Sequence, residues 1–518
     1  MKLVTVSEMA AIEQAADAAG HSYAAMMEHA GRGLAETVHR AYGRDCGTVL
    51  GLVGSGNNGG DTLVALSYLQ DWGWGTTACL VKPRGDSDPL VDRYLKAGGT
   101  LLTFAGDADS PVLSAALRAH DVLLDGVFGT GIRLPLRGAA AAALDFVRTR
   151  LARMDSPPYV VAVDAPSGVD CDTGEAAPET IPAEITVTMA AVKQGLLKFP
   201  AFEKVGDLRV VTIGLPDDLP AAERIHREVV DADRVRCVLP PRPLDGHKGT
   251  FGTVLVVGGS LNYSGAVLLA GEMAFRSGAG WVTLAVPEPL HAALAGAFSE
   301  ATWLLLPHEE GFIASGAADT LLASLDKPTA MLVGPGFGMR ATSRDFIARI
   351  LSAGAALPFL IFDADGLKLL ASVSDWWKQI PAPAVLTPHP GEMSVLTGLS
   401  VREIQASRLE TAERFAAAWG HVVVLKGAFT VIAAPDGRTA VIPVATPALA
   451  RAGTGDVLAG LIAGLRAQGI GAFEAAAAGA WIHAQAGLLA AGLMGSTAAV
   501  LAGDVLSAAV EVLADLAA

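Results

Sequence analysis

The sequence predicts an α/β protein with two domains, each built on a parallel β-sheet. Its 518 residues are more than one hydrophobic core usually serves. Apolar, β-branched runs that end in glycine or an acidic residue alternate with alanine-rich helical stretches, as in parallel α/β architecture. Between two such series, residues 214–244 are rich in Pro, Asp, Glu and Arg, so we expect a domain boundary near residues 216–230.

The expected strands follow one another in two series. In the first domain, residues 1–220, they cover 48–53, 76–81, 122–124, 159–163, 185–189 and 208–213. In the second domain, residues 221–518, they cover 253–257, 281–286, 330–333, 359–362, 384–387 and 422–425. Two helical stretches, 456–466 and 472–492, then complete the second domain.

Composition limits the class of protein. Hydrophobic residues make up 51% of the chain and charged residues 18%, which fits a globular protein with buried strands. We find no uninterrupted apolar span of about 20 residues and no apolar core of a secretory signal, so no membrane association is expected. A net charge of −15 argues against nucleic-acid binding. The cysteines lack a Cys-x-x-Cys spacing, which favours the cytoplasm; they are Cys46, Cys79, Cys171 and Cys237.

The most informative stretch is residues 451–460, where two glycines and a threonine precede Asp456 at the start of an apolar helix. Backbone N–H groups at such a helix start can hold an anion, while the carboxylate accepts a proton from a substrate hydroxyl. Phosphoryl transfer to an alcohol needs this pair of functions. The simpler interpretation is a glycine-rich helix start with an aspartate near its cap.

A glycine-rich turn at residues 54–61 follows a strand of the first domain and opens a helix. It contains Gly-x-Gly-x-x-Gly, but the dinucleotide fingerprint expects an acidic residue about 20 positions later. Lys82 and Arg84 stand there instead, and they would suit an additional phosphate. The two amides and the aspartate of the turn are typical of groups that bind phosphate or sugar hydroxyls.

Polar residues also end two further strands of the first domain, at Asp125 and at Asp164 with Ser167. The carboxyl ends of parallel strands line one crevice, so these side chains and Asn58 are expected to converge. Taken singly, each aspartate could instead cap a helix or a turn.

The Asn-Asn-Gly-Gly-Asp turn, the Asp-Gly-x-Phe-Gly-Thr-Gly strand end and the Asp-x-Pro-Ser-Gly strand end resemble the NAD(P)H-hydrate epimerase domain family, a Rossmann-like three-layer fold. The resemblance implies a hydrated nicotinamide dinucleotide as substrate and epimerisation at its hydroxyl-bearing carbon. It implies a potassium ion near Asn58, Asp125 and Ser167, and Asp164 as the acid/base. The implied substrate contacts are Asn57, Asn58, Gly59, Gly60, Asp61, Gly129, Thr130, Gly131, Ile132, Arg133, Leu134, Pro135 and Asp164.

The second domain carries polar strand ends at residues 247–252, 257–260, 334–338, 363–367, 387–392 and 425–430, and no Walker phosphate loop. With the Ala-Gly-Thr-Gly-Asp helix start, this set is similar to the ribokinase-like ADP-dependent NAD(P)H-hydrate dehydratase family. The resemblance implies Asp456 as base, an anion hole of Gly453, Thr454 and Gly455, and dinucleotide contacts at Ala266, Gly336 and His389. The implied ADP contacts are Lys426, Gly427, Ala428, Phe429 and Thr430. Arg451 departs from the family pattern, and its role stays open.

Together the two resemblances cover nearly the whole chain in the order of bifunctional repair enzymes. They imply that one domain interconverts the R and S hydrates of NADH and NADPH. The other would use ADP and Mg²⁺ to dehydrate the S hydrate, giving the dinucleotide, AMP and phosphate. A cytoplasmic homo-oligomer is expected. Two alternatives stay open: an ATP-dependent small-molecule kinase, and a binding or regulatory protein that has lost catalysis.

Overall fold

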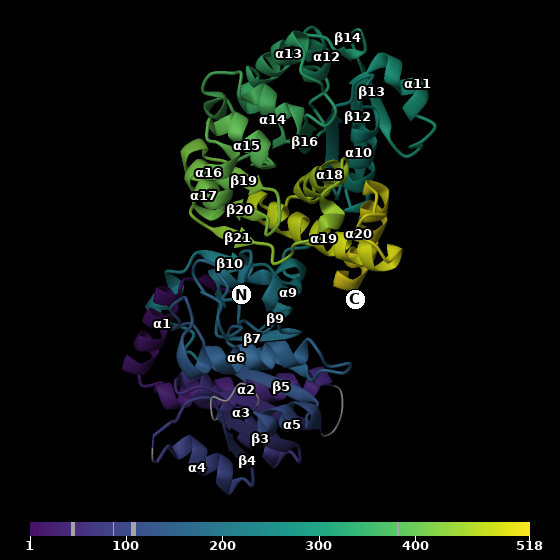
Figure 1. The fold of residues 1–518 in the computed structure, drawn as a ribbon. Helices are drawn as coiled ribbons and strands as arrows, with labels where there is room; N and C mark the ends of the chain where they lie inside the picture. The colour runs from purple at the N-terminus through teal and green to yellow at the C-terminus, as the bar shows by residue number, and fades with distance from the viewer. Residues whose placement is uncertain (43–46, 86, 105–109, 381–382, 518) are drawn as a thin grey trace. The chain divides into compact units, whose positions relative to one another are not determined.

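The computed structural model describes most of the chain, namely residues 1–42, 47–85, 87–104, 110–380 and 383–517. Cys46 lies outside these described residues. The chain divides into two compact units, Met1–His226 and Arg227–Ala518. Each unit is built on one large sheet that carries helices (Figure 1). The predicted α/β class is therefore confirmed in both units.

The sheet of the first unit has seven parallel strands in the order β4-β3-β2-β5-β6-β7-β9. Their bounds are β2 Thr48–Val53, β3 Gly75–Leu80, β4 Thr100–Thr103, β5 Val122–Gly126, β6 Tyr159–Val163, β7 Ile185–Met189 and β9 Asp207–Val211. Every strand predicted for this domain is present. The sequence analysis missed β4, because it is a four-residue edge strand with no buried residue.

Successive strand residues of the first unit face opposite sides of the sheet, which gives three layers. Val49 and Val53 pack with α1 Val6–Ala18, α2 Tyr23–Tyr42 and α3 Asn57–Asp71. Leu50 and Leu52 pack with α5 Pro111–Ala119 and α6 Gly138–Leu151. The helix α4 Pro89–Lys96 packs on α3. A separate pair of two-residue strands, β1 Leu3–Val4 and β8 Val192–Lys193, ties the start of the chain to residue 193.

The sheet of the second unit has ten strands in the order β10-β21-β20-β19-β18-β17-β16-β11-β12-β13. Their bounds are β10 Arg227–Val229, β11 Thr253–Val257, β12 Trp281–Pro287, β13 Thr302–Leu306, β16 Ala330–Val333, β17 Phe359–Phe362, β18 Val385–Leu386, β19 Val422–Leu425, β20 Val431–Ala433 and β21 Thr439–Val441. All pairings are parallel except those of β20, which runs antiparallel to both neighbours. The six predicted strands form the central run of this sheet. The missed strands β10, β13, β20 and β21 lie toward its two edges.

Four helices pack into one core of the second unit, and helices α13 to α17 lie on the other side of the sheet (Figure 1). The four are α10 Gly265–Arg276, α18 Thr454–Ala467, α19 Ala472–Met494 and α20 Ala502–Ala517. On the other side stand α13 Ala341–Leu351, α14 Asp365–Leu370, α15 Pro390–Thr397, α16 Val401–Ala406 and α17 Arg408–Trp419. Glycines bring α10 and α18 into backbone contact, because a Cβ on Gly460 would stand 2.1 Å from the carbonyl oxygen of Ala270.

Helix α19 is long and apolar enough to cross a membrane by length and composition, which the sequence analysis did not anticipate. However, 56% of its most apolar window is buried inside the unit. It packs against α18 and α20, as core helices of globular domains do.

Candidate active sites

Three polar side chains lie around the end of β5 in the first unit. Asp125 and Ser167 are completely buried and Asn58 is 7% exposed. The Ser167 N–H donates to Asp125 Oδ2 at 2.8 Å, and the Phe128 N–H donates to Ser167 Oγ at 2.8 Å. Asp125 Oδ1 and both polar atoms of the Asn58 side chain have no hydrogen-bond partner. Burial raises the pKa of Asp125 to about 6. The unpartnered Asp125 Oδ1 and Asn58 Oδ1 leave buried acceptor capacity unmet, as the cradle of a cation would.

Asp164 follows β6 with a left-handed backbone, φ 62°, an unfavourable conformation for a residue with a side chain. Its Oδ1 accepts hydrogen bonds from Lys193 Nζ, from Thr188 Oγ1 at 3.1 Å and from the Met189 N–H at 3.1 Å. Lys193 is 1% exposed, and it also donates to Thr188 Oγ1 and to the Met189 carbonyl. Asp164 Oδ2 faces Gly129, where an added Cβ would stand 3.4 Å away. One oxygen of Asp164 is therefore fixed and the other faces the site.

The sequence analysis missed Lys193. A signal was present, because this lysine closes the otherwise apolar run Met189-Ala190-Ala191-Val192. A lysine is rarely buried without a partner, so its position next to a strand end pointed to a carboxylate nearby.

A cavity of about 730 Å³ opens above Asp164. Of the predicted substrate contacts, it is lined by Asn57, Asn58, Asp61, Gly129, Thr130, Gly131 and Asp164. Lys193 and Glu13 line it as well. Burial raises the pKa of Asp61 well above its ordinary value, and the charges of Asp164 and Glu13 add to this effect. Gly59 and Gly60 lie outside the lining: a Cβ on Gly59 would meet the Gly54 carbonyl at 2.0 Å, and one on Gly60 would meet Met27.

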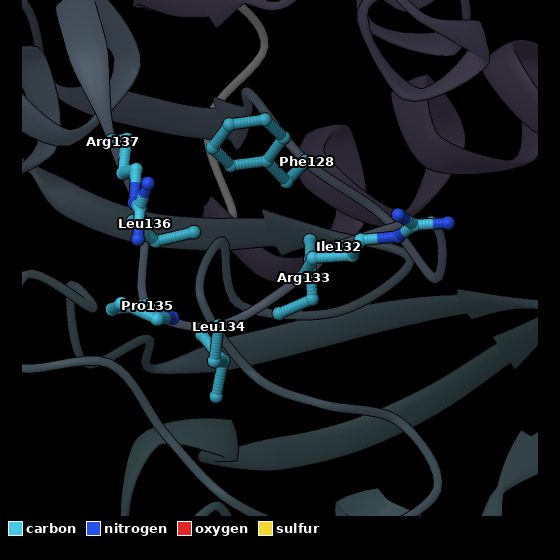
Figure 2. A pocket seen from close by; sticks show the side chains of 8 residues that line it. Phe128, Ile132, Arg133, Leu134, Pro135, Leu136 and Arg137 are labelled. Carbon is cyan, nitrogen blue, oxygen red and sulfur yellow. The ribbon is translucent and has the colours of Figure 1, made fainter.

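The remaining predicted contacts of the first unit line a second cavity of about 400 Å³ (Figure 2). Its walls are Phe128, Gly131, Ile132, Arg133, Leu134, Pro135, Leu136 and Arg137. Arg133 and Arg137 extend to opposite sides of the view in Figure 2, with apolar side chains between them. Phe128 and Gly131 line both cavities, so one loop separates them.

Arg84 holds the glycine-rich turn together. Its Nη1 donates to the carbonyls of Gly54 and Gly56 at 2.6 and 2.9 Å, and its Nε donates to Asp88 at 2.8 Å. Its side chain is only 8% exposed. The Arg84 guanidinium therefore stabilises the glycine-rich turn. The sequence analysis had considered it for an additional phosphate contact instead. Lys82 lies over the ring of Phe128.

In the second unit a mostly buried lysine pairs with two carboxylates. Lys426 Nζ lies 2.7 Å from Asp363 Oδ1 and 3.7 Å from Glu392 Oε2. Asp363 also accepts a hydrogen bond of 2.6 Å from Thr387 Oγ1. A Cβ on Gly455 would stand 3.5 Å from Lys426 Nζ, so the first turn of α18, which carries Asp456, adjoins the lysine. The Lys426 side chain is only 18% exposed, so it belongs to the interior of this site.

The charges of this cluster set the proton affinity of Asp456. Burial raises the pKa of Asp456 to about 7, the charge of Asp363 adds to the rise, and Lys426 opposes it. Burial tends to lower the pKa of Lys426, but Asp363 and Glu392 outweigh it, so the pKa of Lys426 is raised. A carboxyl group with a pKa near neutrality beside a permanent cation is suited to accept a proton.

The start of α18 is shaped as an anion site. Gly453 precedes the helix with φ 92°, and the N–H groups of a first helical turn have no intrahelical acceptor. The Thr454 hydroxyl donates to the Leu449 and Arg451 carbonyls, so it stabilises the turn. His483 Nε2 lies 2.8 Å from the Thr454 carbonyl and must donate to it. Burial lowers the pKa of His483 to about 4, so this ring is neutral at physiological pH.

A cavity of about 430 Å³ adjoins this helix start. Of the predicted residues it is lined by His389, Lys426, Gly427, Ala428, Thr430, Thr454 and Gly455, together with Arg451. Phe429 is buried outside the lining. Arg451 donates to the Ala498 carbonyl. His389 accepts hydrogen bonds from the N–H groups of Gly391 and Glu392 and so caps α15.

Ala266 and Gly336 lie next to each other, since a Cβ on Gly336 would stand 3.3 Å from that of Ala266. Neither lines the cavity beside His389. Within the described residues, no group of three or more His, Cys, Asp or Glu side chains could hold a metal ion.

Two family models match the chain. One, described as YjeF-related protein N-terminus, covers residues 23–195, and the other, described as NAD(P)H-hydrate dehydratase, covers residues 254–508. The bifunctional NAD(P)H-hydrate repair enzyme of Moorella thermoacetica is 38% identical over 514 residues, which covers 98% of this chain and 95% of that protein. The enzyme of the same description from Escherichia coli is 32% identical over 498 residues, covering 95% and 90%.

Solved structures also align with part of the chain. An ADP/ATP-dependent NAD(P)H-hydrate dehydratase from Bacillus subtilis, co-crystallised with ATP and Mg²⁺, is 31% identical with a TM-score of 0.47. The alignment covers 56% of this chain and 98% of that chain.

Proposed function

This chain belongs to the family of bifunctional NAD(P)H-hydrate repair enzymes, and on that premise we propose that each of its two units carries out one of the two reactions. The protein repairs hydrated NADH and NADPH. The first unit interconverts the R and S hydrates, and the second dehydrates the S hydrate to the reduced dinucleotide.

In the first unit, Asp164 Oδ2 is the acid/base that moves protons at the hydroxyl-bearing ring carbon. The observation that supports this proposal is that the two oxygens of the Asp164 carboxylate have different surroundings. Lys193, Thr188 and Met189 donate hydrogen bonds to Oδ1, while Oδ2 faces the cavity. The turn at residues 57–61 and the loop at residues 129–135 contact the rest of the dinucleotide. Their backbone N–H groups suit its phosphates, because a glycine-rich turn and a helix start present N–H donors to anions.

Potassium fits the first unit through Asn58, Asp125 and Ser167. The fit of a potassium ion is supported by Asp125 Oδ1 and Asn58 Oδ1, which are buried acceptors without a hydrogen-bond donor. When bound, the ion supplies positive charge beside the loop that carries Gly129. Asn58 and Asp125 would then hold their present positions without the cost of unmet hydrogen bonds.

In the second unit, Asp456 accepts the proton of the substrate hydroxyl as that oxygen attacks the terminal phosphorus of ADP. AMP leaves and a phosphate ester forms on the ring carbon. The phosphate group then departs from that carbon as the neighbouring ring carbon loses a proton and the ring C=C bond forms, because phosphate is a far better leaving group than hydroxide. Gly453, Thr454 and Gly455 hold the transferred group through N–H donors, and Lys426 to Thr430 hold the nucleotide. Mg²⁺ would supply further charge neutralisation and would be bound in part through the phosphates of the nucleotide.

The test is the recovery of reduced dinucleotide from a mixture of both epimers. With ADP, absorbance should return completely, and with no nucleotide it should not return. A stop near the fraction held by one epimer would contradict the epimerase assignment. Product that retains the phosphate would instead identify a small-molecule kinase.

We also propose that residues 1–220 and 221–518 work as separable domains in a cytoplasmic homo-oligomer. Separate cores in the two units support the division, and a fragment starting near Ala221 should fold and dehydrate the S hydrate. Exposed apolar side chains on and after α19 support self-association, namely Leu488, Leu493, Met494 and Leu501. Light scattering of the full chain tests the oligomer, and an insoluble fragment would contradict the division.

A further inference from the structure

Helix α1 places the carboxylate of Glu13 at the cavity of about 730 Å³ in the first unit. Thr5 and Glu8 form a capping box at the start of α1, and the Val6 N–H donates to Asp172 Oδ1 at 2.9 Å. Met9 and Glu13, one helical turn apart, both line the cavity of about 730 Å³. Pairing of β1 with β8 places the residues just before α1 beside the strand that carries Lys193. The helix is thus fixed at both its cap and its incoming strand.

Glu13 enters a site with a defined set of charges. Asp164 follows β6, Asp61 stands on α3, Lys193 ends β8, and Tyr23 of α2 also lines the cavity. Burial raises the pKa of Glu13, the charge of Asp164 adds to the rise, and Lys193 opposes it. The hydrogen bonds of Lys193 go to Asp164, Thr188 and the Met189 carbonyl. Glu13 has no hydrogen bond or ion pair within the described residues, so its carboxyl group is available to a ligand.

Exchange of configuration at a carbon that bears both a hydroxyl group and a ring nitrogen needs two proton transfers. A proton must reach the departing hydroxyl oxygen as the C–O bond breaks, while the nitrogen lone pair forms a C=N⁺ double bond. Water must then add to the other face of that carbon and lose a proton to a base. One carboxylate held in a single orientation serves only one of these positions well.

We propose that Glu13 is the second acid–base group of epimerisation, the partner of Asp164. Glu13 gives its proton to the hydroxyl oxygen, which leaves as water, and Asp164 Oδ2 takes a proton from the water that adds to the opposite face. The step ends with Glu13 ionised and Asp164 protonated, and proton exchange with solvent, in which Asp164 loses a proton and Glu13 gains one, restores the starting state. This inference rests on the epimerase function proposed above.

The experiment compares three variants of the full chain on the pure R hydrate, with ADP and added excess dehydratase so that epimerisation limits the rate. Glu13→Gln keeps the shape but cannot transfer a proton, so kcat should fall roughly 10²-fold with little change in KM. Glu13→Asp should retain more activity than Glu13→Gln. Asp17→Asn makes the same chemical change at an exposed position of α1 outside the cavity, and it should match the parent protein.

A pH profile separates acid–base catalysis from a structural role. In the parent protein the rate should fall on the alkaline side as Glu13 loses its proton, and this fall should disappear in Glu13→Gln. A Glu13→Gln protein with parental kcat, or one that keeps the alkaline fall, would overturn the inference. If Glu13→Gln melts early, the pH profile of Glu13→Asp decides, and an alkaline fall at the same pH as in Asp17→Asn overturns the inference. If the parent protein does not accelerate epimerisation, the proposed function itself has failed.

Discussion

In both units the proposed carboxylate base lies near a lysine that is largely withdrawn from solvent, but the lysine has a different partner in each. In the first unit Lys193 binds the proposed base, Asp164, directly. In the second unit Lys426 binds Asp363, and the proposed base, Asp456, stands beside this pair with a pKa of about 7. The contrast teaches that direct pairing fixes the orientation of a carboxylate, whereas a nearby pair leaves a carboxylate free to take up a proton at neutral pH.

Removal of the base in the second unit should have the largest effect. Asp456→Asn keeps the size of the side chain but abolishes its basicity, so dehydration of the pure S hydrate should fall by roughly 10² to 10⁴-fold. ADP binding should persist, because the helix start and the Lys426 loop are unchanged. Progress curves and nucleotide titration measure both. If Asp456→Asn lost epimerisation to the same extent, the assignment of one reaction to each unit would be contradicted.

Removal of the proposed base in the first unit should slow the consumption of the R hydrate but not that of the pure S hydrate. Asp164→Asn should slow epimerisation by roughly 10²-fold and leave dehydration of the pure S hydrate at the parental rate. A mixture of epimers should then stall apart from slow spontaneous interconversion. A thermal melt controls for misfolding. If the pure S hydrate is also consumed more slowly, the two units do not divide the chemistry as proposed.

Replacement of potassium should distinguish the units without any mutation. In buffers of a bulky organic cation, epimerisation should slow by about tenfold, the equivalent of about 1.4 kcal/mol, because Asp125 and Asn58 lose their proposed partner. Dehydration should change less, since the proposed potassium cradle lies in the first unit. Rates over a potassium titration give the measurement, and equal sensitivity of both reactions would count against the cradle.

The smallest effect is expected in the pH profile of dehydration. Asp456 must be ionised to act as a base, so the rate should fall as pH decreases through about 7 and level off above it. Lys426→Met removes the charge that lowers the pKa of Asp456, so the acid limb should move to higher pH and the kcat at pH 7 should fall by less than about tenfold. Lys426→Arg should restore the parental limb. An unmoved limb in Lys426→Met would show that Lys426 does not tune Asp456.

Much of this arrangement was predictable from the sequence, because it follows from where strands end. Ser167 meets Asp125 and Asn58 lies beside Asp164 at Gly129, both at strand ends, and the β-branched runs form the central strands. Glu13 was missed, since the pairing of β1 with β8 positions its helix and no local motif records that pairing, whereas Lys193 was missed although it closes an apolar run. His483 was missed for a similar reason: it lies in the middle of an alanine-rich helix and reaches Thr454 across the packing of α18 on α19.

The close contact of α18 with α10 has a consequence for motion. Asp456 occupies the first turn of α18, and from Val457 to Ala467 every residue of this helix is buried. Gly460 and Gly464 leave no room for a side chain between the two backbones. The amide hydrogens of α18 should therefore exchange with solvent only in the rarest openings of the unit, whereas the exposed Gly427 and Ala428 should exchange early. The proposed base is therefore carried by one of the most protected helices of the unit, and the proposed nucleotide loop by one of its more exposed segments.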